Sequence, residues 1–116
     1  MVKSVPTITY PARELPIIAN TDVLVVGGGP AGLSAAIYAT RAGYKTMIIE
    51  KIGFGGQMIL TDLIDNYPGF PDGVTGFELQ QKMVAQALKF GLLEKNTSVT
   101  KIQAEKNFFK VFTDEG

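Results

Sequence analysis

The stretch DVLVVGGGPAGLSAAIYATRAGYKTMIIE, residues 22–50, decides the fold. It opens with a short, β-branched apolar run at 22–26, typical of a strand buried on both faces of a parallel sheet. A helical pattern follows from Pro30, which suits a first helical turn, to Gly43, which suits a C-terminal cap. A second apolar run at 45–50 ends on Glu50. Two strands joined by one helix are most simply parallel neighbours with a right-handed crossover, so the sequence predicts an α/β fold.

Between the first strand and the helix lies the glycine-rich loop G-G-G-P-A-G, residues 27–32. Its G-x-G-x-x-G spacing is informative here because a predicted strand precedes it, a predicted helix follows it, and an acid closes the next strand. Gly27 permits the sharp turn out of the strand, Gly29 lets the backbone approach a pyrophosphate, and Gly32 lets the helix pack closely. The alternative interpretation is a plain glycine turn. The sequence therefore predicts a Rossmann-like FAD/NAD(P)-binding domain.

The same loop and the acid at its side predict which part of a dinucleotide is bound. The helix N-terminus, which includes Pro30 and Ala31, offers free N–H groups and a partial positive charge to phosphates. Glu50 accepts hydrogen bonds from ribose hydroxyls and disfavours a 2′-phosphate, so we expect an ADP moiety and not NADP at this site. The glycine loop alone does not distinguish FAD from NAD.

Composition excludes several other functions. The chain has 116 residues without cysteine or histidine, so thiol nucleophiles, disulfides, thiolate metal sites and histidine bases are impossible within it, and we assign no catalytic residue and no metal ligand. Lys plus Arg equals Asp plus Glu at 11 each, which favours neither nucleic acid nor an anionic membrane. The apolar stretches are far shorter than the roughly 20 residues of a membrane span, and no signal peptide is recognisable, so we expect a cytoplasmic protein.

The sequence predicts one globular domain preceded by an N-terminal arm. Residues 1–21, with prolines at 6, 11 and 16, predict an extended N-terminal arm, either a tail without function or a segment that docks on the domain or a partner. Residues 22–116 predict the globular lobe. Within this lobe, residues 51–72 predict a long loop, and Thr75 to Glu78 predict a capping box at the start of a helix. This helix ends at Gly91 and has an apolar face. That face comprises Phe77, Met83, Val84, Ala87 and Leu88.

The C-terminal part predicts the start of a small β-meander. Residues 98–103 and 107–113 have the pattern of short strands. Asp114, Glu115 and Gly116 form a turn signal, and a turn normally leads to another strand. The lobe is therefore expected to be incomplete.

Two further elements carry a resemblance to a known family. Gly55-Gly56-Gln57 is followed by I-D-N-Y-P-G-F-P at 64–71 and by G-F-E-L at 76–79. This order and spacing resemble the FAD-binding lobe of low-molecular-weight thioredoxin reductases and the related alkyl hydroperoxide reductase flavoprotein, in the pyridine nucleotide-disulfide oxidoreductase class II family. The resemblance runs from about residue 22 to the end. It implies FAD as the cofactor and NAD(P)H-dependent reduction of a disulfide protein as the parent activity.

The resemblance also implies places for residues beyond the glycine loop. Those on the ribityl and isoalloxazine side are Gly55, Gly56, Gln57 and Asn66. Thr61 is placed near the flavin ring, and the backbone of Val99 near the adenine. Lys51 either flanks the ribose or is simply solvated. Paired glycines are equally typical of a flexible loop, and an asparagine before Tyr67 and Pro68 is also typical of a local Asx turn; Tyr67 and Phe70 are expected to serve in packing.

Departures from the family pattern limit what the chain does alone. In that family the Cys-x-x-Cys and the NADPH site lie in a second domain, and a C-terminal Gly-Asp element completes the FAD domain; none of these occurs in this sequence. NAD(P)H and a disulfide protein are thus expected partners only through further polypeptide, and a homo-oligomer is expected. Three alternatives stay open: a non-catalytic FAD-binding fragment, a relative of the ferredoxin-NADP reductase type, and an NAD-binding regulatory module.

Overall fold

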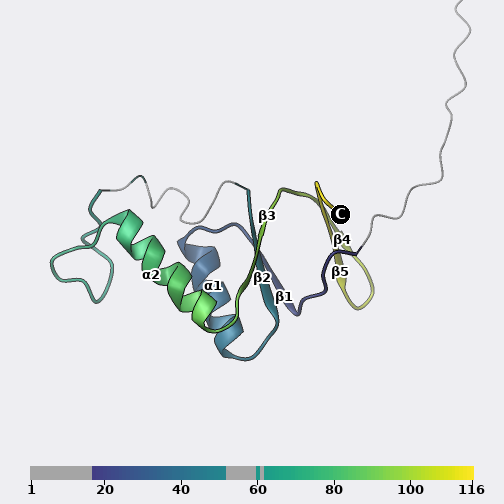
Figure 1. The fold of residues 1–116 in the computed structure, drawn as a ribbon, viewed down its shortest axis with the longest axis horizontal. Coiled ribbons are helices and arrows are strands. Elements are labelled where there is room, and N and C mark those ends of the chain that lie inside the picture. Colours follow the sequence, from purple (N-terminus) through teal and green to yellow (C-terminus); the bar gives the residue numbers. More distant parts are fainter. Residues whose placement is uncertain (1–16, 52–59, 61) are drawn as a thin grey trace, which may run out of the picture.

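The computed structural model describes residues 17–51, 60 and 62–116 (Figure 1). Its elements follow one another as β1 (Val23–Val26), α1 (Pro30–Arg41), β2 (Thr46–Glu50), α2 (Gly76–Lys89), β3 (Leu93–Asn96), β4 (Val99–Ala104) and β5 (Phe109–Thr113). The predicted arm is described only from residue 17, and residues 17–20 are exposed and have no regular structure. Among the described residues, no helix combines the length and apolar character that crossing a bilayer requires.

The centre of the fold is a three-stranded parallel sheet in the order β1-β2-β3. The predicted strand–helix–strand unit is confirmed, with Val26 of β1 opposite Ile49 of β2. Helix α1 ends as expected at a glycine, because Gly43 has a φ of +91°, and its N–H donates to the carbonyl oxygen of Thr40 at 3.0 Å. β3 was not expected from the sequence.

Both helices lie on the same side of this sheet (Figure 1). Apolar side chains of the helices, of β2 and of the residues that flank α2 form one buried core, which comprises Leu33, Ala36, Ile48, Val74, Leu79, Met83, Ala87 and Leu92. The expectation that the first strand is buried on both faces is wrong. Val23 to Val25 are only partly buried and Val26 is 53% exposed, because no described helix covers the opposite face.

Helix α2 begins at a side-chain cap. The Thr75 hydroxyl oxygen accepts the Glu78 N–H at 3.1 Å, as expected of the first half of a capping box. The predicted apolar face needs a correction, since Phe77 is 55% exposed and Leu88 is 45% exposed. At about 100° per residue these two side chains lie roughly opposite Leu79, which leads the buried stripe with Met83 and Ala87.

The last two strands form an antiparallel hairpin, as the sequence predicts for the start of a meander. The hairpin lies on the other side of the sheet from the helices (Figure 1). Lys95 of β3 pairs with Glu115 just after β5, with 2.7 Å between the ammonium nitrogen and a carboxylate oxygen. Ile102 and Phe109 are more than half exposed and share one face of the hairpin by its register, so this face is apolar and open.

Candidate functional site

The glycine loop begins where β1 separates from β2. The last backbone bond of the ladder runs from the Gly27 N–H to the Ile49 carbonyl oxygen, at 2.8 Å. Gly27 then has a φ of +107°, a conformation that side-chain-bearing residues rarely adopt. The predicted role of Gly27, a sharp turn out of the strand, matches this geometry.

Gly32 lies where α1 passes closest to the loop. A Cβ on Gly32 would overlap the carbonyl oxygen of Gly27 and would stand 3.1 Å from a methyl group of Val25. Any side chain here would therefore push the helix off the strand. This close approach is the packing role that the glycine spacing predicts for the last glycine of the loop.

Gly29 is the N-cap residue of α1 and has open space beside it. Its backbone is extended, with φ −75° and ψ −176°, and its carbonyl oxygen accepts the Leu33 N–H at 2.9 Å. A Cβ on Gly29 would have nothing within 4 Å. An added methyl group would thus occupy only space that a ligand could use.

The N-terminus of α1 has the properties of an anion site. Pro30 and Ala31 are exposed, and the first turn contains no acidic residue. The first N–H groups of a helix have no partner within the helix and carry its partial positive charge. A diphosphate next to Gly29 would meet both the free N–H groups and this charge.

Glu50 stands beside the loop at the end of β2. Its carboxylate accepts a hydrogen bond from the Gly28 N–H, and its other oxygen accepts the Lys51 N–H at 3.0 Å. Glu50 is half-buried and Lys51 is exposed. The expected proximity of the acid to the glycine loop is therefore present. Gly28 lies within the predicted loop, but as a variable position of the G-x-G-x-x-G pattern it has no individual role in the sequence analysis; in the structure it is buried and contacts Glu50.

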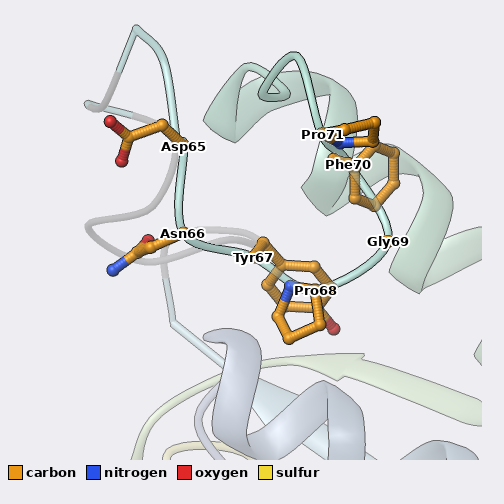
Figure 2. A pocket seen from close by; sticks show the side chains of 7 residues that line it. All are labelled: Asp65, Asn66, Tyr67, Pro68, Gly69, Phe70 and Pro71. Atoms are coloured by element: carbon orange, nitrogen blue, oxygen red, sulfur yellow. The ribbon is translucent and has the colours of Figure 1, made fainter.

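The loop before α2 holds the next expected site residue, Asn66. Residues 65–71 line a shallow, open hollow of about 530 Å³ (Figure 2). Asn66 is exposed, and its side chain points away from the rings of Tyr67 and Pro68 (Figure 2). Phe70 packs against the core and lies 6.0 Å from the Tyr67 ring between centroids, which agrees with the packing role expected of it.

Tyr67 connects the same loop to the two helices. Together with Ile37 of α1 and Met83 of α2 it lines a groove of about 330 Å³. Gly73 fixes the end of the loop with a φ of +82°, and Ile64 and Val74 exchange backbone hydrogen bonds at 2.7 and 2.9 Å. The loop that carries Asn66 is thereby closed on itself and seated on the helices.

The remaining expected site residues fall into two groups. Val99 begins β4 in the hairpin and is half-buried. The positions outside the described residues are Gly55, Gly56, Gln57 and Thr61. The structure therefore joins Gly27, Gly29, Gly32 and Glu50 in one site and places Asn66 and Val99 on separate elements.

A family model supplies the decisive comparison. Residues 21–116 match the model of the pyridine nucleotide-disulphide oxidoreductases. The chain belongs to this family.

Within the pyridine nucleotide-disulphide oxidoreductases, the chain is similar to thioredoxin reductases. The chain is 43% identical over 95 residues to the thioredoxin reductase of Treponema pallidum and 45% identical over 97 residues to that of Rickettsia conorii. These matches cover 82% and 84% of this chain, but only 31% of each relative. The crystal structure of thioredoxin reductase from Lactococcus lactis superposes with a TM-score of 0.79 at 36% identity, over 84% of this chain and 32% of that one.

These findings confirm the resemblance and the fold class. The chain is an α/β, FAD-binding lobe of the thioredoxin reductase type, and it spans about a third of the length of the relatives that it matches. The individual roles of the site residues and the division at residue 21 into arm and lobe stay predictions.

Proposed function

We propose that this chain holds the ADP half of FAD within a flavoprotein that passes electrons from NAD(P)H through FAD to a protein disulfide. One observation carries the proposal: the open, positively polarised N-terminus of α1 lies beside a carboxylate at the end of the neighbouring parallel strand. This is the arrangement that a diphosphate and its adenosine ribose require. The names of the relatives, which are thioredoxin reductases, supply the rest.

In this proposal each residue of the loop has a binding role. The N–H groups at the start of α1 bind the diphosphate, and the missing side chain of Gly29 leaves room for it. Glu50 accepts hydrogen bonds from the adenosine ribose, flanked by Lys51. The lobe comprises residues 22–116, and residues 1–21 form an arm outside it.

The flavin side of the site rests on the family resemblance. Its residues are Gly55, Gly56, Gln57, Thr61 and Asn66. The backbone of Val99 lies against the adenine. When bound, FAD supplies the electron transfer between nicotinamide and disulfide, and these residues only position it and shape its surroundings.

The chain contributes no acid, base or nucleophile of its own to the reaction. With neither cysteine nor histidine in the sequence, the dithiol chemistry requires other polypeptide, from the same protein or from a partner. NAD(P)H and the disulfide substrate bind there. Self-association and a cytoplasmic location complete the proposal.

The test is a titration of the purified 116-residue chain with FAD, followed by flavin absorbance and fluorescence. We expect saturable binding of FAD and competition by ADP. A colourless protein that gains stability from NAD but none from FAD would contradict the flavin assignment. Gly29→Ala is the matched variant: its added methyl group meets no packed atom but occupies the open side of the loop, so we expect it to weaken FAD binding.

A second assay separates binding from turnover. We expect the chain alone, loaded with FAD, to leave NADPH unoxidised in the presence of a disulfide substrate. Robust turnover without any other polypeptide would show that the lobe is catalytically sufficient, against the proposal.

A further inference from the structure

The Gly28 N–H lies at the point where backbone pairing between β1 and β2 stops. One residue earlier, the Gly27 N–H still donates to the Ile49 carbonyl oxygen. Gly27 then turns the chain away from the sheet, yet Gly28 itself is buried. A buried N–H without a partner destabilises the fold by roughly 1–3 kcal/mol, so this group needs an acceptor.

That acceptor is a side chain. The Glu50 carboxylate takes the Gly28 N–H, immediately after the backbone of Ile49 has taken the Gly27 N–H. Glu50 thus extends the ladder between the two strands by one further bond. The next residue, Gly29, is the N-cap of α1, so Gly28 directly precedes the N-terminus of this helix.

We propose that Glu50 is a positioning residue for the phosphate-binding loop, in addition to its contact with the ribose. Its carboxylate holds Gly28, and through Gly28 it holds Gly29 and the first turn of α1 in the geometry that receives a diphosphate. This inference rests on the proposed function for its biological meaning. The hydrogen bond itself exists without any ligand.

Inorganic pyrophosphate separates positioning from ribose binding. Pyrophosphate has no ribose, so an acid that bound only the ribose would not contribute to pyrophosphate binding. Because like charges repel, removal of the Glu50 charge would then leave pyrophosphate binding unchanged or stronger. A positioning acid predicts the opposite change in affinity: Glu50→Ala weakens pyrophosphate binding by about tenfold, for the loss of one partly buried hydrogen bond.

Glu50→Gln is the conservative variant. Its amide oxygen can still accept the Gly28 N–H, while the Lys51 N–H is exposed and can turn to water. We expect this variant to bind pyrophosphate at least as well as the natural chain. Rescue by glutamine, with failure of alanine, is an outcome that a charge effect cannot produce.

The chain contains its own matched control at the other end of the same strand pair. There the Asp22 carboxylate accepts the Lys45 N–H at 2.8 Å, again a side chain extending the pairing of β1 with β2. Asp22→Ala removes a similar bond far along the strand from the glycine loop. We expect it to lower the unfolding midpoint but to leave pyrophosphate affinity within about twofold, since the loop is intact.

The experiment combines calorimetric titration with pyrophosphate and amide hydrogen exchange by NMR, on the full chain and its three variants. In the natural chain we expect slow exchange at Gly28, lost in Glu50→Ala and retained in Glu50→Gln and Asp22→Ala. Unchanged Gly28 exchange in Glu50→Ala would overturn the inference, and so would pyrophosphate affinity equal to or above that of the natural chain.

The exchange measurement needs no ligand, so the two proposals fail separately. Loss of Gly28 protection in Glu50→Ala, in a chain that binds neither FAD nor ADP, would support the loop geometry and refute the proposed function. FAD binding by the natural chain, together with unaltered Gly28 exchange in Glu50→Ala, would support the proposed function and refute the positioning role of Glu50.

Discussion

At the residue scale, two glycines of the loop have different roles: Gly32 allows close packing, and Gly29 leaves space for a ligand. Substitution by alanine can separate these roles. In Gly32→Ala the new methyl group would overlap the Gly27 carbonyl oxygen, which is backbone and cannot rotate away. We expect a loss of about 3 kcal/mol in the free energy of unfolding, as for overpacking in a tight site. Urea denaturation measures it, and an unaltered midpoint would show that the helix can move without cost.

Gly29→Ala should have the opposite profile. The added methyl group meets nothing within 4 Å, and the backbone of Gly29 is in a region that alanine adopts readily. We therefore expect less than about 1 kcal/mol of destabilisation, typical of an N-cap change, but at least tenfold weaker binding of ADP, because the methyl group occupies the space of the diphosphate. Calorimetric titration with ADP measures this, and unchanged affinity would place the diphosphate elsewhere.

At the element scale, helix α2 depends on the cap at Thr75. Because its hydroxyl oxygen accepts the Glu78 N–H at 3.1 Å, Thr75→Ala leaves a first-turn donor to solvent. We expect a loss of about 1 kcal/mol in the free energy of unfolding, measured by urea denaturation. Thr75→Ser keeps the hydroxyl and should retain most of the stability; if serine and alanine were equally destabilising, the hydrogen bond would not be the cause.

Elements differed in how far sequence could predict them. β1, α1 and β2 were predictable because glycine, proline and β-branched residues act through local backbone preferences. β3 was missed because Leu93–Asn96 reads L-E-K-N, with a single apolar residue, and becomes a strand only through pairing with β2. Phe77 was misassigned for a related reason: which side of α2 is buried depends on where α1 and the sheet lie.

The candidate site shows the same difference between features that local sequence predicts and features that depend on contacts between elements. Gly27, Gly29, Gly32 and Glu50 could be predicted as site residues because their spacing encodes a local geometry. The individual role of Gly28 could not be predicted, since it depends on a bond to a side chain on a neighbouring strand, and a variable position in a motif gives no sign of that bond. Contacts between elements carry information that spacing along the chain does not.

At the scale of the whole molecule, the described lobe has one covered and one open sheet face. Val26 of β1 is 53% exposed, and Phe109, which belongs to the separate two-stranded sheet of β4 and β5, is 71% exposed. The ion pair between Lys95 and Glu115, which joins β3 to the end of the hairpin, has both side chains more than a third exposed, and such pairs contribute little. The stability of this lobe therefore rests mainly on the core between the helices and β2.

A lobe of this kind should gain stability from its cofactor, and the pattern of ligands tests where the binding energy lies. If only the folded chain binds FAD, a free concentration of one hundred times Kd raises the free energy of unfolding by about 2.7 kcal/mol. ADP at the same free concentration as FAD should retain most of this gain, because in the proposed function the glycine loop and Glu50 bind the diphosphate and the ribose. Riboflavin lacks both groups, so at the concentration used for ADP it should stabilise far less. Urea denaturation with each ligand measures the effect, with Gly29→Ala as the control that loses it; equal stabilisation by riboflavin and ADP would move the main contacts away from the glycine loop.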